Sequence, residues 1–175
     1  MRTPLESIKI RLKREGEKSL GFFNSISPAD WGQQVYTSGG KWNVQQILCH
    51  FVSTELAFEK LIQNILLGGS GAPRDFDIDR FNESEASKLE GEPIDDLLTQ
   101  FEAARARTCQ LVGALQEADL GRIGFHPWFG EIEIEKMLKL IYRHNMIHLR
   151  DVRKALSTKQ PVPHLEIELP STRPP

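Results

Sequence analysis

The sequence lacks the features that mark membrane, secreted and nucleic-acid-binding proteins. No apolar run approaches the roughly 18 residues of a transmembrane helix, and the first residues form no apolar stretch of the secretory type. The 24 acidic and 22 basic side chains nearly balance, giving a net charge of −2, without the basic surplus typical of nucleic-acid binding. These absences predict a protein with neither a membrane nor a nucleic-acid partner.

Cysteine is also scarce. The 2 cysteines, Cys49 and Cys109, show no metal-type spacing and are too few for a disulfide framework. We therefore expect a reducing, cytoplasmic location. Cys49 precedes His50, but on a helix its side chain points about 100° away. This favours a packed core residue over a nucleophile.

Strand-like alternation and internal repeats are absent, whereas helical periodicity is abundant. Apolar residues recur at steps of three and four over residues 5–26, 43–67, 93–115 and 131–156. Four amphipathic helices predict an all-α fold, a four-helix bundle. The long connections 27–42 and 68–92 permit an order other than simple up-down-up-down, and the second has room for a short helix at 84–89. Only residues 165–169 resemble a strand.

Local signals set the expected helix boundaries and one contact between helices. Asn43 is suited to cap the second helix, and Pro93 fits the first position of the third. Gly16 and Ser19 interrupt the first apolar stripe with small side chains. They either let a neighbouring helix approach closely, or Gly16 is a weak point that costs about 1 kcal/mol.

The predicted domain organisation is a helical bundle over residues 1–157 and a proline-rich tail over residues 158–175. Five of the 10 prolines follow Ser157. A segment of this composition is expected to lie extended on the surface.

The 5 histidines carry the functional signal. His144 and His148 are four residues apart, so they share one face of the predicted fourth helix, within its apolar stripe. Burying imidazoles there without partners costs free energy. The two rings could bind one metal ion, with His50, on the flank of the second helix's stripe, as the third ligand. Three nitrogen ligands with open positions are typical of a catalytic metal site. The alternative is a set of core histidines hydrogen-bonded to carboxylates or backbone.

The other two histidines are in less regular segments. His126, in the loop 121–130, either lines the mouth of a pocket or has no special role. His164, in the proline-rich tail, is expected to be solvated.

The order of these motifs resembles the DinB-like superfamily. The segment Lys41–His50 is similar to the superfamily's tryptophan-to-histidine motif, and Ser27–Trp31 is typical of the preceding loop. The later motifs follow in the expected elements. They are His126-Pro127 to Gly130-Glu131, then His144-x-x-x-His148-Leu149-x-Asp151.

The resemblance implies a four-helix bundle in up-down-down-up order. It also implies a divalent transition metal ion, zinc or nickel, with His50, His144 and His148 as ligands. Members of the superfamily are commonly homodimers. Its characterised enzymes include transferases and isomerases that use a low-molecular-weight thiol, namely mycothiol, bacillithiol or glutathione.

Two carboxylates, Asp151 and Glu55, each have two possible roles. Asp151 stands where relatives frequently have glutamine. It either accepts a hydrogen bond from a ligand imidazole or is a surface group paired with Arg150 or Lys154. Glu55 either faces the site as a general base or forms a buried pair with Arg105.

The leading hypothesis is an enzyme that activates a thiol or water at the metal for attack on a small-molecule substrate. A dimeric metal- or small-molecule-binding protein without turnover is the alternative, and a purely structural bundle is a third. No residue is assigned a catalytic role. Arg80 or Arg105 could bind a substrate carboxylate if the loop 68–92 covers the site; otherwise that loop is solvated. Its polar side chains include Arg74, Asp75, Arg80, Asn82 and Glu83.

Overall fold

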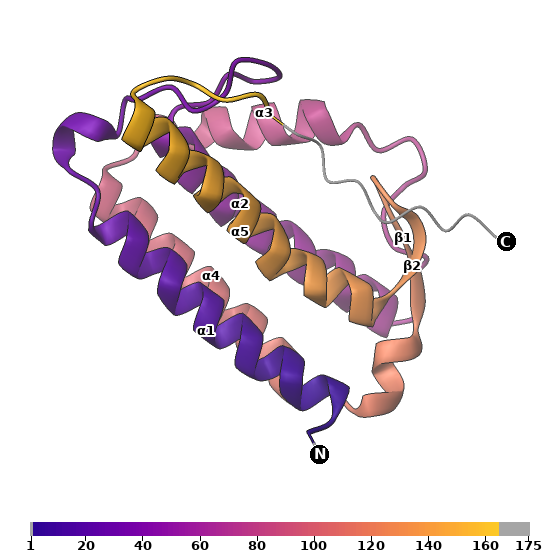
Figure 1. Cartoon of the computed structure of the whole chain (residues 1–175). Helices are drawn as coiled ribbons and strands as arrows, with labels where there is room; N and C mark the ends of the chain where they lie inside the picture. Colours follow the sequence, from indigo (N-terminus) through magenta and orange to yellow (C-terminus); the bar gives the residue numbers. More distant parts are fainter. Residues whose placement is uncertain (1, 165–175) are drawn as a thin grey trace, which may run out of the picture.

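The computed structural model describes residues 2–164 and is dominated by four long helices (Figure 1). These are α1 (Pro4–Asn24), α2 (Val44–Leu66), α4 (Ile94–Ala114) and α5 (Ile134–Thr158). A shorter helix, α3 (Ile78–Leu89), and an antiparallel hairpin of β1 (Ile123–His126) and β2 (Gly130–Glu133) lie between them in sequence. Two short 3₁₀ turns span Pro28–Asp30 and Glu117–Gly121.

The order of the long helices is up-down-down-up. Figure 1 shows α1 and α5 running in one direction and α2 and α4 in the other. Each of α1 and α2 packs against both α4 and α5. This confirms the predicted four-helix bundle and its unusual order. Within residues 2–164, no helix combines the length and apolar character needed to cross a membrane.

Short-range hydrogen bonds fix where the first two long helices begin. At α1, Thr3 accepts from the amide of Glu6, whose side chain accepts from the Thr3 amide. At α2, the Asn43 side chain accepts from the Gln46 amide at 2.8 Å, as its predicted capping role requires. Pro93 is the N-cap of α4, one position before the predicted site.

The structure corrects two predicted boundaries. The fourth helix begins at Ile134 and not at residue 131, because residues 130–133 form strand β2. This strand pairs with β1, and Ile132 of β2 lies opposite Gly124 of β1. Gly130 has a φ of 68°, a conformation that favours glycine and closes the hairpin turn. The short helix predicted at 84–89 extends from Ile78, where the Asp77 side chain caps its first turn.

The core consists of two apolar clusters separated by a polar layer. One cluster, around Phe23, Phe51 and Phe101, fills the end of the bundle where α1 ends and α2 and α4 begin. The other, around Ile8 and Met137, fills the opposite end. The buried polar side chains from the middle of the long helices lie between them, and they include Ser19, His50, Glu55, Arg105, Thr108, Asn145 and His148.

Arg105 of α4 connects all four long helices within this polar layer. Its guanidinium donates to the Leu12 carbonyl of α1 at 2.9 Å and, through Nε, to Glu55 of α2 at 3.0 Å. With the Asn145 amide of α5 oriented so that both of its polar atoms are satisfied, its oxygen accepts from Arg105 at 2.9 Å and its nitrogen donates to the Ile141 carbonyl at 3.2 Å. A charge is stable in a bundle interior only when it is well paired, and here each of the three guanidinium nitrogens has an acceptor.

Gly16 of α1 provides the space that Arg105 occupies. A Cβ atom at this position would lie 2.7 Å from Cγ of Arg105, inside van der Waals contact. The small side chain therefore permits a close approach between α1 and α4, as one of the two sequence interpretations proposed.

Residues 159–164 run along the surface, as the prolines predicted, but Val162 anchors them to the bundle. Lys159, with a φ of 54°, ends α5 and turns the chain back. Val162 is buried, and its amide donates to the Val35 carbonyl at 2.8 Å, while Thr37 donates to the Val162 carbonyl at 3.0 Å. The expected strand-like piece, residues 165–169, lies outside the described residues, and the domain boundary after residue 157 stays a prediction.

Replacement of Gly16 by alanine is expected to destabilise the bundle by about 1–3 kcal/mol, because the added methyl group overpacks against Arg105. Gly21 on the same helix is the matched control, since no atom lies within 4 Å of a Cβ placed there. Gly21→Ala should raise stability by roughly 0.4–1 kcal/mol. Urea unfolding measures both changes, and a Gly16→Ala variant as stable as Gly21→Ala would contradict the close-packing interpretation.

Candidate metal centre

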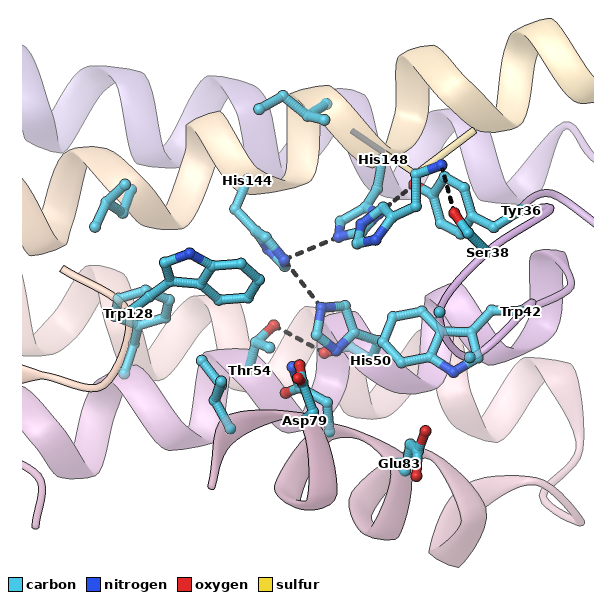
Figure 2. A pocket seen from close by; sticks show the side chains of 18 of the residues that line it. Tyr36, Ser38, Trp42, His50, Thr54, Asp79, Glu83, Trp128, His144 and His148 are labelled. Carbon is cyan, nitrogen blue, oxygen red and sulfur yellow. Dashed lines mark hydrogen bonds between the residues drawn. The ribbon is translucent and has the colours of Figure 1, made fainter. Parts of the chain in front are cut away.

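Three histidines from α2 and α5 converge in the structure. The Nε2 atom of His144 lies 2.9 Å from Nε2 of His50 and 2.9 Å from Nε2 of His148 (Figure 2). One ligand atom from each of the three lies within 4.8 Å of the other two. The structure thus brings together the three residues that the sequence singled out, although two of them are separated from the third by about a hundred positions.

The chemistry of this cluster suits a divalent transition metal ion. A neutral imidazole carries one proton, so three rings whose Nε2 atoms face one another cannot all be satisfied by hydrogen bonds among themselves. The Nδ1 atom of His50 is buried and has no hydrogen-bond partner within the described residues. Convergent imidazole nitrogens are ligands that zinc and nickel accept. The residues therefore fit the metal that the resemblance implies.

Burial keeps the three rings neutral. It lowers the pKa of His144 to about 4 and holds the pKa values of His50 and His148 well below the ordinary histidine value. The positive charge that a neighbouring histidine would carry lowers the pKa of His50 and His148 further. Near pH 7 the rings are therefore unprotonated at one nitrogen, the state that metal ligation requires.

His148 is oriented by a hydrogen-bonded pair on its far side. The hydroxyl of Tyr36 lies 2.6 Å from Nδ1 of His148 and 3.4 Å from a carboxylate oxygen of Asp151. Burial, and then the charge of Asp151, raise the pKa of Tyr36 well above its ordinary value, so the phenol stays protonated and donates to Asp151. It can then accept the Nδ1 proton of His148, which leaves Nε2 free to face the cluster.

Asp151 matches each of the two sequence-based alternatives only in part. Its side chain is buried and reaches the His148 ligand through Tyr36, and its other oxygen accepts from Arg150 at 2.9 Å. Sequence reasoning did not identify Tyr36. The only local signal is an aromatic residue in an irregular loop, which does not reveal a partner 112 positions away.

Glu55 is the partner of Arg105 and not a general base. One of its oxygens accepts from Arg105, and the other accepts from the Thr108 hydroxyl at 2.7 Å. Cys49 is buried, as the sequence predicted. Burial raises the pKa of its thiol to about 11, which opposes a role as a nucleophile.

A cavity of about 400 Å³ opens from the three histidines. Its walls come from the turn before α2, from α3, from the β1–β2 hairpin and from the segment after α5. Aromatic side chains dominate the walls, and they are Tyr36, Trp42, Phe58, Trp128 and Phe129. The polar side chains besides the three clustered histidines are Ser38, Thr54, Asp79, Asn82, Glu83, His126 and His164.

The two remaining histidines both line this cavity. His126 is 7% exposed and stacks on Phe129, with ring centroids 5.2 Å apart. Of the two alternatives for this histidine, the structure favours the one in which it lines a pocket. The prediction of a solvated His164 is wrong. Its ring lies 4.5 Å from that of Tyr36 and 5.6 Å from that of His148, because the backbone pairing of Val162 carries the segment over the site.

The arginines proposed to bind a substrate carboxylate do not line the cavity. Arg80 is exposed on α3, and Arg105 is buried in its ion pair. Arg74 pairs with Glu131 at 2.6 Å. The segment 68–92 does cover the site, but α3 presents acidic and amide side chains to it instead.

Comparison with known families decides the classification. Residues 11–152 match the family model described as DinB superfamily. The chain belongs to the DinB superfamily. This confirms the resemblance seen in the sequence. None of the curated proteins compared with this chain matches it.

Three solved structures have a similar fold. YfiT from Bacillus subtilis, described as a probable metal-dependent hydrolase with an unusual four-helix bundle topology, superposes with a TM-score of 0.72 at 17% identity, covering 89% of this chain and 88% of that one. A mycothiol-dependent maleylpyruvate isomerase gives a TM-score of 0.72 at 15% identity, and the match covers 87% of this chain but 63% of the isomerase. An uncharacterised protein from Escherichia coli UTI89 gives 0.69 at 14% identity, covering 93% and 98%.

The lowered pKa values of the clustered histidines predict acid sensitivity of the metal-free protein. Below pH 6.5, the ordinary histidine value, the unfolded chain binds protons that the folded chain excludes. The free energy of unfolding should therefore be constant above about pH 7 and decrease as the pH falls from 6.5 toward 4, by up to about 1.4 kcal/mol per pH unit for each histidine.

Urea unfolding in EDTA at several pH values measures this slope. A variant with His50, His144 and His148 all replaced by glutamine is the control, because carboxylates elsewhere contribute equally to both proteins. Equal slopes in the two proteins would contradict the prediction.

Tyr36→Phe should weaken zinc binding by about tenfold, because it removes the hydrogen-bond partner of His148 and keeps the ring that packs there. Tyr142→Phe, at the other tyrosine, is the matched control and should bind zinc as the wild type does. Competition with a chromogenic chelator gives the dissociation constants. Equal zinc affinity of Tyr36→Phe and wild type would show that the tyrosine does not orient the ligand.

Proposed function

We propose that this DinB superfamily member is a metal-dependent enzyme that activates a thiol or water for attack on a small-molecule electrophile. The observation that carries the proposal is the convergence of three neutral imidazole nitrogens at the base of a cavity. His50, His144 and His148 would hold the ion, and zinc or nickel would suit this nitrogen donor set. Three protein ligands leave positions for water or substrate, as catalytic sites require.

A divalent ion in such a site lowers the pKa of a bound thiol or water toward neutrality. The residues of this chain supply the surroundings. Tyr36 and Asp151 hold His148 in one orientation, and the aromatic walls limit the access of bulk water. His50, His144 and His148 stay neutral at pH 7, so they leave the charge of the ion undiminished.

The structural neighbours support both a thiol and water as the nucleophile of the proposed reaction. One is described as a probable metal-dependent hydrolase and another as a mycothiol-dependent isomerase. Water and a low-molecular-weight thiol are accordingly the two candidate nucleophiles. A thiol-dependent reaction also suits the reducing cytoplasm proposed for this chain, in which both cysteines are free. The homodimer stays a prediction.

Metal binding is the first test. The purified protein should bind close to one equivalent of zinc or nickel per chain, and His148→Ala should reduce the affinity at least about a hundredfold because it removes a ligand. His126→Ala is the matched control, since this histidine lines the same cavity outside the cluster. Titration calorimetry and elemental analysis measure the binding. A protein that binds no metal, and whose stability in chelator is unchanged by His148→Ala, would refute the proposal.

Turnover separates the enzyme from a binding protein. Low-molecular-weight thiols and water are to be screened against small electrophiles with the metal-loaded protein, with His148→Ala as the blank. A metal-dependent rate that the variant lacks supports the enzyme. Stoichiometric metal binding with no such rate supports the non-catalytic dimeric binding protein.

A further inference from the structure

In the part of the chain that the structure describes, every ionised side chain that lines the cavity is acidic. Asp79 and Glu83 come from α3 and are one helical turn apart, and Figure 2 shows both on the helix that faces the three histidines. Among residues 2–164 the lining contains no lysine or arginine, and the histidines in the lining whose pKa burial lowers are neutral. The cavity wall opposite the metal ligands therefore carries negative charge alone.

These two carboxylates are exposed on α3, and Asp79 lies in the first turn of that helix. Within residues 2–164, neither Asp79 nor Glu83 forms an ion pair or a side-chain hydrogen bond, although basic residues are available nearby in sequence. Arg74 pairs with Glu131, and Lys88 pairs with Glu85. Like charges one turn apart destabilise a helix. The dipole of α3 favours Asp79 in the first turn, but no ion pair within residues 2–164 neutralises either charge where it lines the cavity.

Two indoles flank the acidic face. Trp42 lies against His50, with ring centroids 4.6 Å apart, and Trp128 projects from the hairpin turn with 40% of its surface exposed. Figure 2 shows the two tryptophans on either side of the histidine cluster, with Asp79 and Glu83 between them on α3. Indole faces attract organic cations, most strongly when water is partly excluded.

His126 gives an independent sign that the cavity binds a ligand. Its Nδ1 accepts from the Trp128 amide at 3.2 Å, so its proton is on Nε2 when the ring is neutral. The ring is held between Phe58 and Phe129, is 7% exposed, and its Nε2 has no hydrogen-bond partner within the described residues. An N–H without an acceptor, on a ring that lines the cavity and is 7% exposed, is suited to an oxygen of a bound molecule.

We propose that the cavity binds an organic cation, with its ammonium or guanidinium group held by Asp79 and Glu83 and against the faces of Trp42 and Trp128. An oxygen of the same molecule would accept from His126. A purely anionic substrate would meet two carboxylates and, within the described lining, no basic side chain. This inference rests on the proposed function, because it takes the cavity beside the metal ligands as the substrate site.

Three probes of similar size and different charge test the proposal, namely benzylamine, benzyl alcohol and benzoate at pH 7. NMR titration of the indole N–H signals of Trp42 and Trp128 gives their dissociation constants in EDTA. Benzylammonium should bind about tenfold more tightly than benzyl alcohol, and benzoate should bind most weakly. Benzyl alcohol or benzoate binding as tightly as benzylammonium would overturn the proposal.

Charge-removing variants identify the groups responsible. Asp79→Asn/Glu83→Gln should reduce the preference for benzylammonium over benzyl alcohol to less than about twofold, and Trp128→Leu should reduce it in part. Asp96→Asn/Glu102→Gln removes two charges from α4 outside the cavity lining and should keep the full preference. A preference that survives in the first variant would refute the assignment. Circular dichroism verifies that α3 remains folded.

Repeating the titrations with zinc present separates this inference from the proposed function. A cation preference in a protein that binds no metal would refute the metal-dependent enzyme and support the cation site. Metal binding and turnover without any cation preference would support the metal-dependent enzyme and refute the cation site.

Discussion

The buried guanidinium of Arg105 is the interaction on which the rest of the structure depends. It belongs to α4 and bonds to the Leu12 carbonyl of α1, to Glu55 of α2 and to the Asn145 amide of α5. Removing one partner of such a buried pair typically costs about 3–5 kcal/mol, because the remaining charge is left without compensation. The hydrogen bonds are directional, so they fix the rotation and height of each helix more narrowly than apolar packing alone. These hydrogen bonds at the middle of the bundle thus hold the four helices in their up-down-down-up arrangement.

The same polar layer determines the candidate metal centre. Asn145 bonds to Arg105 and is the neighbour of His144, and Glu55 is little more than one turn after His50 on α2. The connections that hold α2 and α5 to α4 therefore also hold the imidazoles of α2 and α5 at facing positions. The site is consequently built on rigid elements, whereas its cavity walls come from turns, the hairpin and α3, which can vary between superfamily members without disturbing the ligands.

The parts of this arrangement that were predictable depend on local spacing. The N-cap at Asn43 and the shared helix face of His144 and His148 each follow from the geometry of a single helix, and both were predicted from the sequence. The place of Tyr36 behind His148 and the stacking of His164 depend on backbone pairing between segments more than a hundred residues apart. The hairpin was missed because its strands have only 4 residues each, too few for alternation to stand out from the helical pattern that follows.

The pairing of Val162 with the segment around Tyr36 has a consequence for how the protein matures. A chain is synthesised from its amino terminus, so residues 159–164 emerge from the ribosome after all four long helices. The loop that carries Tyr36 has no backbone partner at Val162 until then. The position of the tyrosine behind His148 therefore depends on a segment that is synthesised after the four long helices.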